Sequence, residues 1–145
     1  MRIDIDHILL EIESLPEYKT QLSLQVTADG NSGEGKLENL NHTEKDFNLF
    51  AYDLPYTNSI LTWLGMYRSR LMKMKPKTCY SYHWDPTKRM HIPIITNENN
   101  FFVIDDEVSR YPADGSYYLI DTTKKHTFVN ASFENRLHIV GCVDD

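Results

Sequence analysis

The residues with the clearest potential for chemistry are His83 and Asp85, which stand one residue apart at the end of a predicted strand. In an extended chain, residues two apart point to the same side. This spacing therefore presents an imidazole and a carboxylate to one point in space. A histidine from a neighbouring strand would complete a set of two histidines and one carboxylate. Such a set binds Fe(II) and leaves coordination positions open for a chelating cosubstrate and dioxygen.

The His-x-acid pattern alone carries little weight. A chain with six histidines and 21 acidic residues is expected to contain roughly one such match by chance. A second match occurs at His42 and Glu44, but Thr43 has the features of a helix cap, so we interpret this match as a coincidence away from the strands. For His83 taken alone, a structural or surface histidine is the ordinary interpretation.

The C-terminal half supplies a third candidate ligand and a cation. His126 follows a predicted strand and turn, and Arg136 lies ten residues later at the start of the last predicted strand. That interval has room for a strand, a turn and entry into an antiparallel neighbour, which returns Arg136 to the region of His126. Its guanidinium could then pair bidentately with the far carboxylate of a dicarboxylic ligand that chelates the metal. No other histidine has an arginine ten residues on.

The elements that must position these residues are short strands. In the last part of the chain, β-branched or aromatic runs alternate with turn-forming residues, which is typical of a sandwich or barrel. The predicted strands span residues 68–74, 78–82, 90–95, 101–104, 116–120, 126–129 and 137–143.

The N-terminal part has a different pattern. Aliphatic residues at helical spacing predict helices over residues 4–14 and 57–66, and alternation of polar and apolar residues predicts a strand over 20–28. We therefore expect a single domain of 145 residues. Residues 1–66 would form an N-terminal elaboration and residues 67–145 the β core.

Composition limits the class of protein. With 41% hydrophobic and 25% charged residues, the chain resembles an ordinary globular domain. Its net charge of −6 argues against a nucleic acid or an anionic membrane as the main partner. Cys79 and Cys142 lack the spacing of a disulfide framework or a zinc finger. Because no stretch has the character of a signal peptide or a membrane span, we expect a cytoplasmic protein.

Two segments resemble the aspartyl/asparaginyl β-hydroxylase-like branch of the Fe(II)/2-oxoglutarate-dependent oxygenases. The first, MKPKTCYSYHWDPTKRMHIPI, is similar to the family's strand, proline-containing turn and strand, followed by His-x-(Asp or Gly)-Pro-Thr and Arg-x-His-(Leu or Ile). The second, DGSYYLIDTTKKHTFVNASFENRLHIV, is similar to its glycine turn, apolar strand ending in Asp, histidine five residues later and arginine ten beyond. The resemblance runs from Met74 to Val143.

This resemblance implies roles for the candidate residues. His83 and His126 match the two metal-binding histidines, and Asp85 stands where some members have glycine and related oxygenases have a carboxylate ligand. The three would form the catalytic metal site. Arg136 matches the arginine that binds the distal carboxylate of 2-oxoglutarate.

The resemblance also extends to neighbouring strand residues. Arg89 and His91, alternate residues of one strand, match residues that contact the carboxylate next to the metal. The ordinary alternatives are a surface arginine and a hydrogen-bonded core histidine. His138, on the same face as Arg136, is interpreted as a packing residue, with pocket lining as the alternative. Where the family often places a serine that assists the distal carboxylate, this chain has Met72.

Together with the strand pattern, the resemblance implies a mainly β fold, a double-stranded β-helix of the jelly-roll or cupin kind with N-terminal helices packed outside. It implies an Fe(II)- and 2-oxoglutarate-dependent dioxygenase that hydroxylates an amino-acid side chain, free or in a peptide or protein. Two other classes stay open. A metal-binding cupin isomerase or lyase would use the histidines without needing Arg136, and a catalytically silent β-sandwich binding module would need neither.

Overall fold

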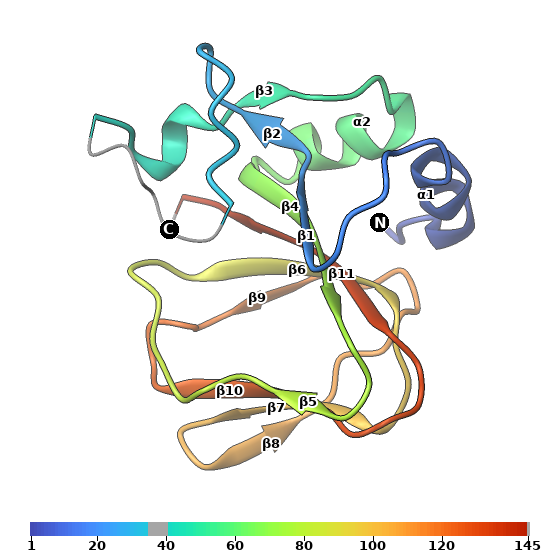
Figure 1. The fold of residues 1–145 in the computed structure, drawn as a ribbon, viewed down its shortest axis with the longest axis vertical. Helices are drawn as coiled ribbons and strands as arrows, with labels where there is room; N and C mark the ends of the chain where they lie inside the picture. Colours follow the sequence, from blue (N-terminus) through green and yellow to red (C-terminus); the bar gives the residue numbers. More distant parts are fainter. Residues whose placement is uncertain (35–40, 145) are drawn as a thin grey trace.

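A computed structural model of the chain describes residues 1–34 and 41–144. Two larger β-sheets face each other, and a two-stranded sheet and two helices lie beyond one of them, at the top of the view in Figure 1. The helices are α1 (Ile5–Ile12) and α2 (Pro55–Trp63). Neither has the length and apolar character that crossing a membrane requires of a helix, and no other helix in the described ranges does.

The first sheet has five strands in the order β1-β4-β11-β6-β9, and every neighbouring pair is antiparallel. Its strands are β1 (Gln21–Ser23), β4 (Tyr67–Met74), β6 (Arg89–Ile95), β9 (Tyr118–Ile120) and β11 (Arg136–Cys142). The central strand, β11, is buried along its whole length. The N-terminal part thus contributes an edge strand to this sheet.

The second sheet has four antiparallel strands in the order β5-β10-β7-β8. Its strands are β5 (Thr78–Cys79), β7 (Asn100–Ile104), β8 (Glu107–Ser109) and β10 (His126–Asn130). From β4 to β11 the chain passes back and forth between the two sheets, with only the β7–β8 hairpin staying within one. This winding is a double-stranded β-helix of the jelly-roll or cupin kind, as predicted.

The first sheet has one apolar and one polar face, because side chains alternate along each strand. In β6, Ile92 and Ile94 pack in an apolar cluster with Ile8 of α1. The alternate residues Arg89 and His91 point the other way and line a cavity between the sheets. The helices therefore cover the apolar face, and the polar face is turned toward the second sheet.

Two strand predictions need correction. The expected strand over 20–28 is interrupted, and its second part, β2 (Gln25–Val26), pairs with β3 (Leu49–Phe50). The reason is that the Gln25 side chain bonds to the backbone of Met66 and Ser69. The expected strand over 78–82 has ladder pairing only at Thr78–Cys79.

Strand β8 was not predicted. It forms a hairpin with β7 through Asp105 and Asp106, which both have positive φ values, 50° and 63°. Such a turn is typical of Asn or Gly, and two aspartates in sequence are a weaker signal for it. The hairpin therefore had no strong signature in the sequence.

Candidate metal centre

The two candidate histidines are held side by side by the backbone. The His83 amide donates to the His126 carbonyl at 3.1 Å, and the His126 amide donates to the His83 carbonyl at 2.9 Å. This single antiparallel bridge brings their ring centroids to 4.4 Å from each other. The Asp85 amide donates to the Thr122 carbonyl at 2.8 Å, which fixes the third residue beside them.

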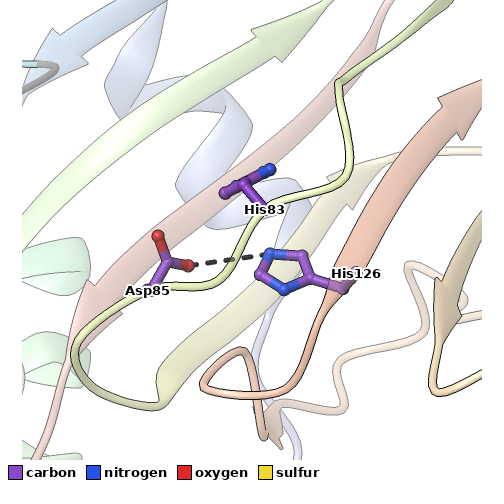
Figure 2. A group of neighbouring side chains, drawn as sticks. All are labelled: His83, Asp85 and His126. Carbon is purple, nitrogen blue, oxygen red and sulfur yellow. Dashed lines mark ion pairs between the residues drawn. The ribbon is translucent and has the colours of Figure 1, made fainter.

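Figure 2 shows the resulting group of side chains. One ligand atom from each of His83, Asp85 and His126 lies within 4.8 Å of the others, and an Asp85 carboxylate oxygen is 3.7 Å from Nε2 of His126. A divalent ion about 2 Å from each ligand would draw these atoms closer together through side-chain rotation. In the described ranges, this is the one group of His, Cys, Asp and Glu with such spacing.

The protonation of the two imidazoles suits metal binding. Nδ1 of His83 lies 2.7 Å from the Ser81 carbonyl, and Nδ1 of His126 lies 2.7 Å from the Lys124 carbonyl. A carbonyl only accepts, so each Nδ1 carries the hydrogen and each Nε2 presents a lone pair. Nε2 of His126 is buried without a hydrogen-bond partner. Two neutral imidazole nitrogens and one carboxylate fit a metal such as Fe(II).

His83 and Asp85 border a cavity of about 500 Å³ between the sheets, and His126 is buried beside them. Its wall is strongly basic, because its charged side chains are Asp85 and four arginines: Arg68, Arg70, Arg89 and Arg136. The space is large enough for a small ligand. The charges of the wall favour an anionic one.

Arg136 is a buried cation without a partner. It starts β11, its exposed fraction is 1%, and none of its three guanidinium nitrogens has a hydrogen-bond partner. Its Cζ lies 5.5 Å from the ring centre of Phe102 and 5.6 Å from that of Phe128. Burial lowers the pKa of Arg136 to about 10, so the group still carries its charge at neutral pH. A buried charge is costly unless a ligand or an acid pairs with it.

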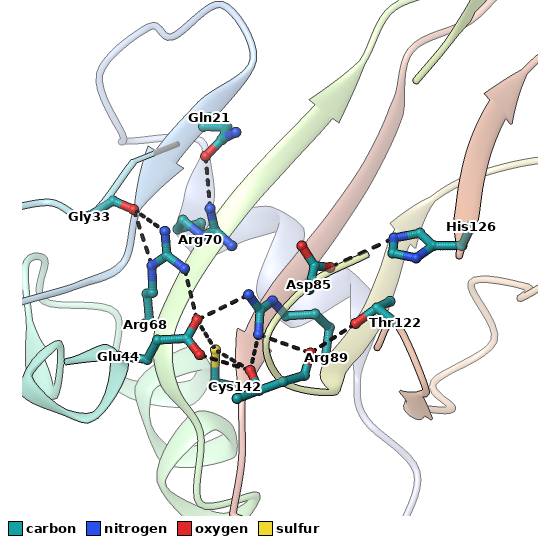
Figure 3. A network of polar contacts seen from close by, with 11 residues as sticks. Gln21, Gly33, Glu44, Arg68, Arg70, Asp85, Arg89, Thr122, His126 and Cys142 are labelled. Atoms are coloured by element: carbon teal, nitrogen blue, oxygen red, sulfur yellow. Dashed lines mark hydrogen bonds and ion pairs between the residues drawn. The ribbon is translucent and has the colours of Figure 1, made fainter. Parts of the chain in front are cut away.

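Arg89 also reaches the cavity, but an acid of the chain already engages it. Its guanidinium lies 3.0 Å from Glu44, whose carboxylate is also 2.9 Å from Arg68 (Figure 3). Thr87 and Cys142 donate further hydrogen bonds to Glu44. The expectation that Glu44 lies away from the strands is therefore wrong. Contact between Arg89 and a cosubstrate stays a prediction.

The environment of Glu44 predicts a pH-dependent contribution to stability. Desolvation alone would raise the pKa of Glu44, but Arg89 and the hydrogen bonds from Thr87, Cys142 and Arg68 outweigh it and lower the pKa. The stabilisation is therefore complete above the pKa of an unfolded glutamate, about 4.3. It is lost as the pH falls through the lower folded-state value.

We expect Glu44→Gln to lower the free energy of unfolding by about 3 kcal/mol at neutral pH, because two buried arginines lose their anion. Near pH 3, below the pKa of an unfolded glutamate, the difference between the variant and the wild type should be smaller. Urea unfolding at both pH values measures the difference. Glu107→Gln, at an exposed position in β8, is the matched control, and an equal loss at both pH values would contradict the ion-pair explanation.

His91 and His138 form a buried pair. Their Nδ1 atoms are 3.0 Å apart, and each side chain has an Nε2 atom without a hydrogen-bond partner. His91 lines the cavity with Arg136, and its contact with a cosubstrate stays a prediction. Burial and then the charge of Arg136 lower the pKa of both histidines well below the usual range, so both are neutral at neutral pH.

Arg70 is a cavity residue that the sequence placed in a local excess of basic residues but to which it assigned no role at the site. Its Nη1 donates to the Gln21 side chain at 3.1 Å, its Nε is buried without a partner, and no carboxylate among the described residues forms an ion pair with it. Burial, followed by repulsion from Arg68 and Arg89, lowers the pKa of Arg70 to about 10. Arg70 alternates with Arg68 and Met72 along β4, so all three lie on one face of the strand, which lines the cavity. This alternation is the signal in the sequence that could have identified Arg70 as a cavity residue.

The facing sheets and the grouped His-His-Asp side chains define a cupin-like barrel with a candidate metal site. The sequence model for aspartyl/asparaginyl β-hydroxylase matches residues 4–144, so the chain belongs to that family. Among curated proteins, none matches this chain.

Several solved structures are similar to parts of the fold. The plu4264 protein of Photorhabdus luminescens is 19% identical, with a TM-score of 0.43 over 53% of this chain and 62% of that one. A Cupin 2 conserved barrel domain protein of Salinispora arenicola CNS-205 is 14% identical, with a TM-score of 0.43 over 52% and 61%. The DMSP lyase DddQ of Ruegeria pomeroyi DSS-3 is 12% identical, with a TM-score of 0.45 over 57% and 40%.

Proposed function

We propose that this chain is an Fe(II)- and 2-oxoglutarate-dependent dioxygenase that hydroxylates an amino-acid side chain, free or in a peptide or protein. The observation that carries the proposal is the unpartnered guanidinium of Arg136, which lines the same cavity as His83 and Asp85 of the His-His-Asp group. A metal-binding cupin isomerase or lyase would use the metal ligands without needing the buried charge of Arg136. A diacid chelated at the metal provides the missing anion.

The residues of the chain would divide the binding work. His83, Asp85 and His126 would hold the iron, with both Nδ1–H groups fixed by backbone carbonyls. Arg136 would pair with the far carboxylate of 2-oxoglutarate. The rings of Phe102 and Phe128 pack against Arg136 and shield the ion pair from water. Low solvent access strengthens such a pair.

Bound iron would supply the oxidative chemistry, in which dioxygen and 2-oxoglutarate are converted to carbon dioxide and succinate while one oxygen atom enters a substrate C–H bond. The role of the protein is to bind both small molecules, orient the substrate and exclude water. Both cysteines are free, Cys79 exposed and Cys142 buried, which fits the cytoplasmic location that we also propose.

Arg70 favours a substrate with an acidic group. With Arg136 assigned to the cosubstrate and Arg68 and Arg89 both paired with Glu44, Arg70 is the cavity cation that has no carboxylate partner among the described residues. A carboxylate of the substrate would satisfy its free Nε. We therefore expect the substrate to carry a carboxylate close to the carbon that is hydroxylated.

Arg70→Met should weaken binding of a carboxylate-bearing substrate by roughly 30-fold, because a buried charged pair is worth about 2 kcal/mol or more. The affinity for 2-oxoglutarate should change much less. A thermal-shift panel of amino acids and short peptides, with manganese and 2-oxoglutarate present, identifies the ligands, and titration of the best one measures the loss. Arg70→Lys, which keeps the charge, is the control. Equal binding by Arg70→Met would remove Arg70 from the substrate site.

The proposed reaction is tested by measuring oxygen consumption and succinate formation with Fe(II), 2-oxoglutarate and the ligands found in the panel. Stoichiometric oxygen uptake and succinate formation would support a dioxygenase. Turnover of a ligand without oxygen would instead indicate a metal-dependent isomerase or lyase. Failure to bind Fe(II), Mn(II) or Zn(II) would indicate a binding module.

A further inference from the structure

The facing Nδ1 atoms of His91 and His138 can share only one hydrogen. The two residues lie on the neighbouring strands β6 and β11, and each is 1% exposed. Their facing Nδ1 atoms are 3.0 Å apart, so one nitrogen donates and the other accepts. The choice of donor also decides which of the two outer Nε2 atoms carries a hydrogen, because both rings are neutral.

The surroundings of His138 favour a lone pair on its Nε2. This residue borders a small gap between side chains together with Arg136 and Asn100. All three nitrogens of the Arg136 guanidinium lack a partner, and Oδ1 of Asn100 is the one orphaned side-chain acceptor among the residues described around that space. Unpaired donors therefore exceed unpaired acceptors, and a lone pair on His138 Nε2 is stabilised by the nearby charge of Arg136. A hydrogen there would add one more donor next to a cation.

The surroundings of His91 favour the complementary form. Its ring borders the large cavity, together with Arg70 and Arg136. Two guanidiniums without carboxylate partners make this cavity a place for anions. An anion next to the ring accepts hydrogen bonds, so a hydrogen on Nε2 of His91 is stabilising and a lone pair is repulsive. The surroundings of His138 and those of His91 thus favour the same pair of tautomers, with a lone pair on Nε2 of His138 and a hydrogen on Nε2 of His91.

We propose that His138 is a positioning residue: its Nδ1–H donates to Nδ1 of His91 and fixes His91 as the Nε2–H tautomer, which offers a neutral hydrogen-bond donor to the anion in the cavity. The identity of that anion as 2-oxoglutarate rests on the proposed function, whereas the tautomers themselves do not. Because the donor is neutral, His91 contributes directional binding without adding a further charge to a cavity already rich in arginine.

The tautomers can be measured directly in the metal-free protein with succinate present, a diacid that supplies the anion favoured by the cavity. Long-range ¹H–¹⁵N spectra of the imidazole rings distinguish Nδ1–H from Nε2–H, and His91→Gln and His138→Gln assign the two sets of signals. At neutral pH we expect His138 as Nδ1–H and His91 as Nε2–H. The opposite pair of tautomers, or a charged His91, would overturn the proposal.

Two variants of similar shape separate positioning from packing. His138→Asn keeps an N–H donor near the position of Nδ1, and His138→Leu has nearly the same shape without the donor. We expect His91 to remain Nε2–H in the Asn variant and to lose this preference in the Leu variant. If the Leu variant retained a pure Nε2–H His91, the role of His138 would be refuted, whatever its effect on stability.

Ligand binding gives the second measurement. In zinc-loaded protein, we expect the Kd of 2-oxoglutarate to rise about fivefold in His138→Leu and to stay near the wild-type value in His138→Asn, because one neutral hydrogen bond is worth about 1 kcal/mol. An equal loss in both variants would contradict positioning through the donor. If the wild-type protein did not bind 2-oxoglutarate, the proposed function would fail, and the ring spectra would still decide the tautomer proposal.

Discussion

Replacing Asp85 with alanine is expected to lower the affinity for Fe(II) or Mn(II) by more than about 100-fold at neutral pH. Removing even an indirect partner of a metal ligand costs about 10- to 100-fold in affinity, and Asp85 supplies the one carboxylate of the group. Two neutral imidazoles would remain, with no negative charge to balance the ion. Asp85→Glu should retain part of the metal affinity and lose activity, because its carboxylate is displaced by one methylene group.

Metal titration of the purified, chelator-treated variants measures this effect. Asp121→Ala is the matched control, since Asp121 lies five residues before His126 but bonds to Thr123 within a turn. Its metal affinity should stay at the wild-type value. Wild-type affinity in Asp85→Ala would show that two histidines suffice or that the ligands lie elsewhere.

Replacing Arg136 has the second large expected effect. Arg136→Ala should leave metal binding nearly intact while weakening 2-oxoglutarate by roughly 30- to several-thousand-fold, which corresponds to about 2–5 kcal/mol for a truncated buried charge pair. Calorimetric titration of 2-oxoglutarate into the manganese-loaded variant and wild type measures the change. Equal affinities would remove Arg136 from the cosubstrate site.

The same residue should reveal a conflict between stability and function. In the absence of a ligand, Arg136 is a charge buried against Phe102 and Phe128 without a partner. Arg136→Met, which fills similar space without a charge, should therefore raise the free energy of unfolding by on the order of 2 kcal/mol. Arg110, exposed and also placed over a phenylalanine ring, provides the control: Arg110→Met should change neither stability nor 2-oxoglutarate binding appreciably.

The sequence was most informative where one strand determined the answer. Alternation alone predicts that His83 and Asp85 share a side, and the structure places their ligand atoms together with one of His126. The same alternation separates the buried Ile92 from the cavity residue His91. These predictions depend on a period of two residues, which the backbone imposes locally.

Features that depend on pairing between distant segments could not be predicted in the same way. Glu44 reaches Arg89 and Cys142 across the fold, and the sequence offers no pattern that links a short 3₁₀ helix to these strands. Likewise, the contact between His91 and His138 depends on the register of β6 against β11. A one-residue shift would turn one ring to the opposite face.

The position of β11 has a consequence for the order of folding during synthesis. This strand lies between β4 and β6 in the first sheet, yet it follows every other described strand along the chain. The ribosome therefore releases β4 and β6 before the strand that joins them, and the strand edges that pair with β11 stay without hydrogen-bond partners until residues 136–142 emerge. Such late, non-local pairing is slow and leaves the chain open to aggregation. Because β11 also carries Arg136, the cavity gains its buried cation only as the sheet closes.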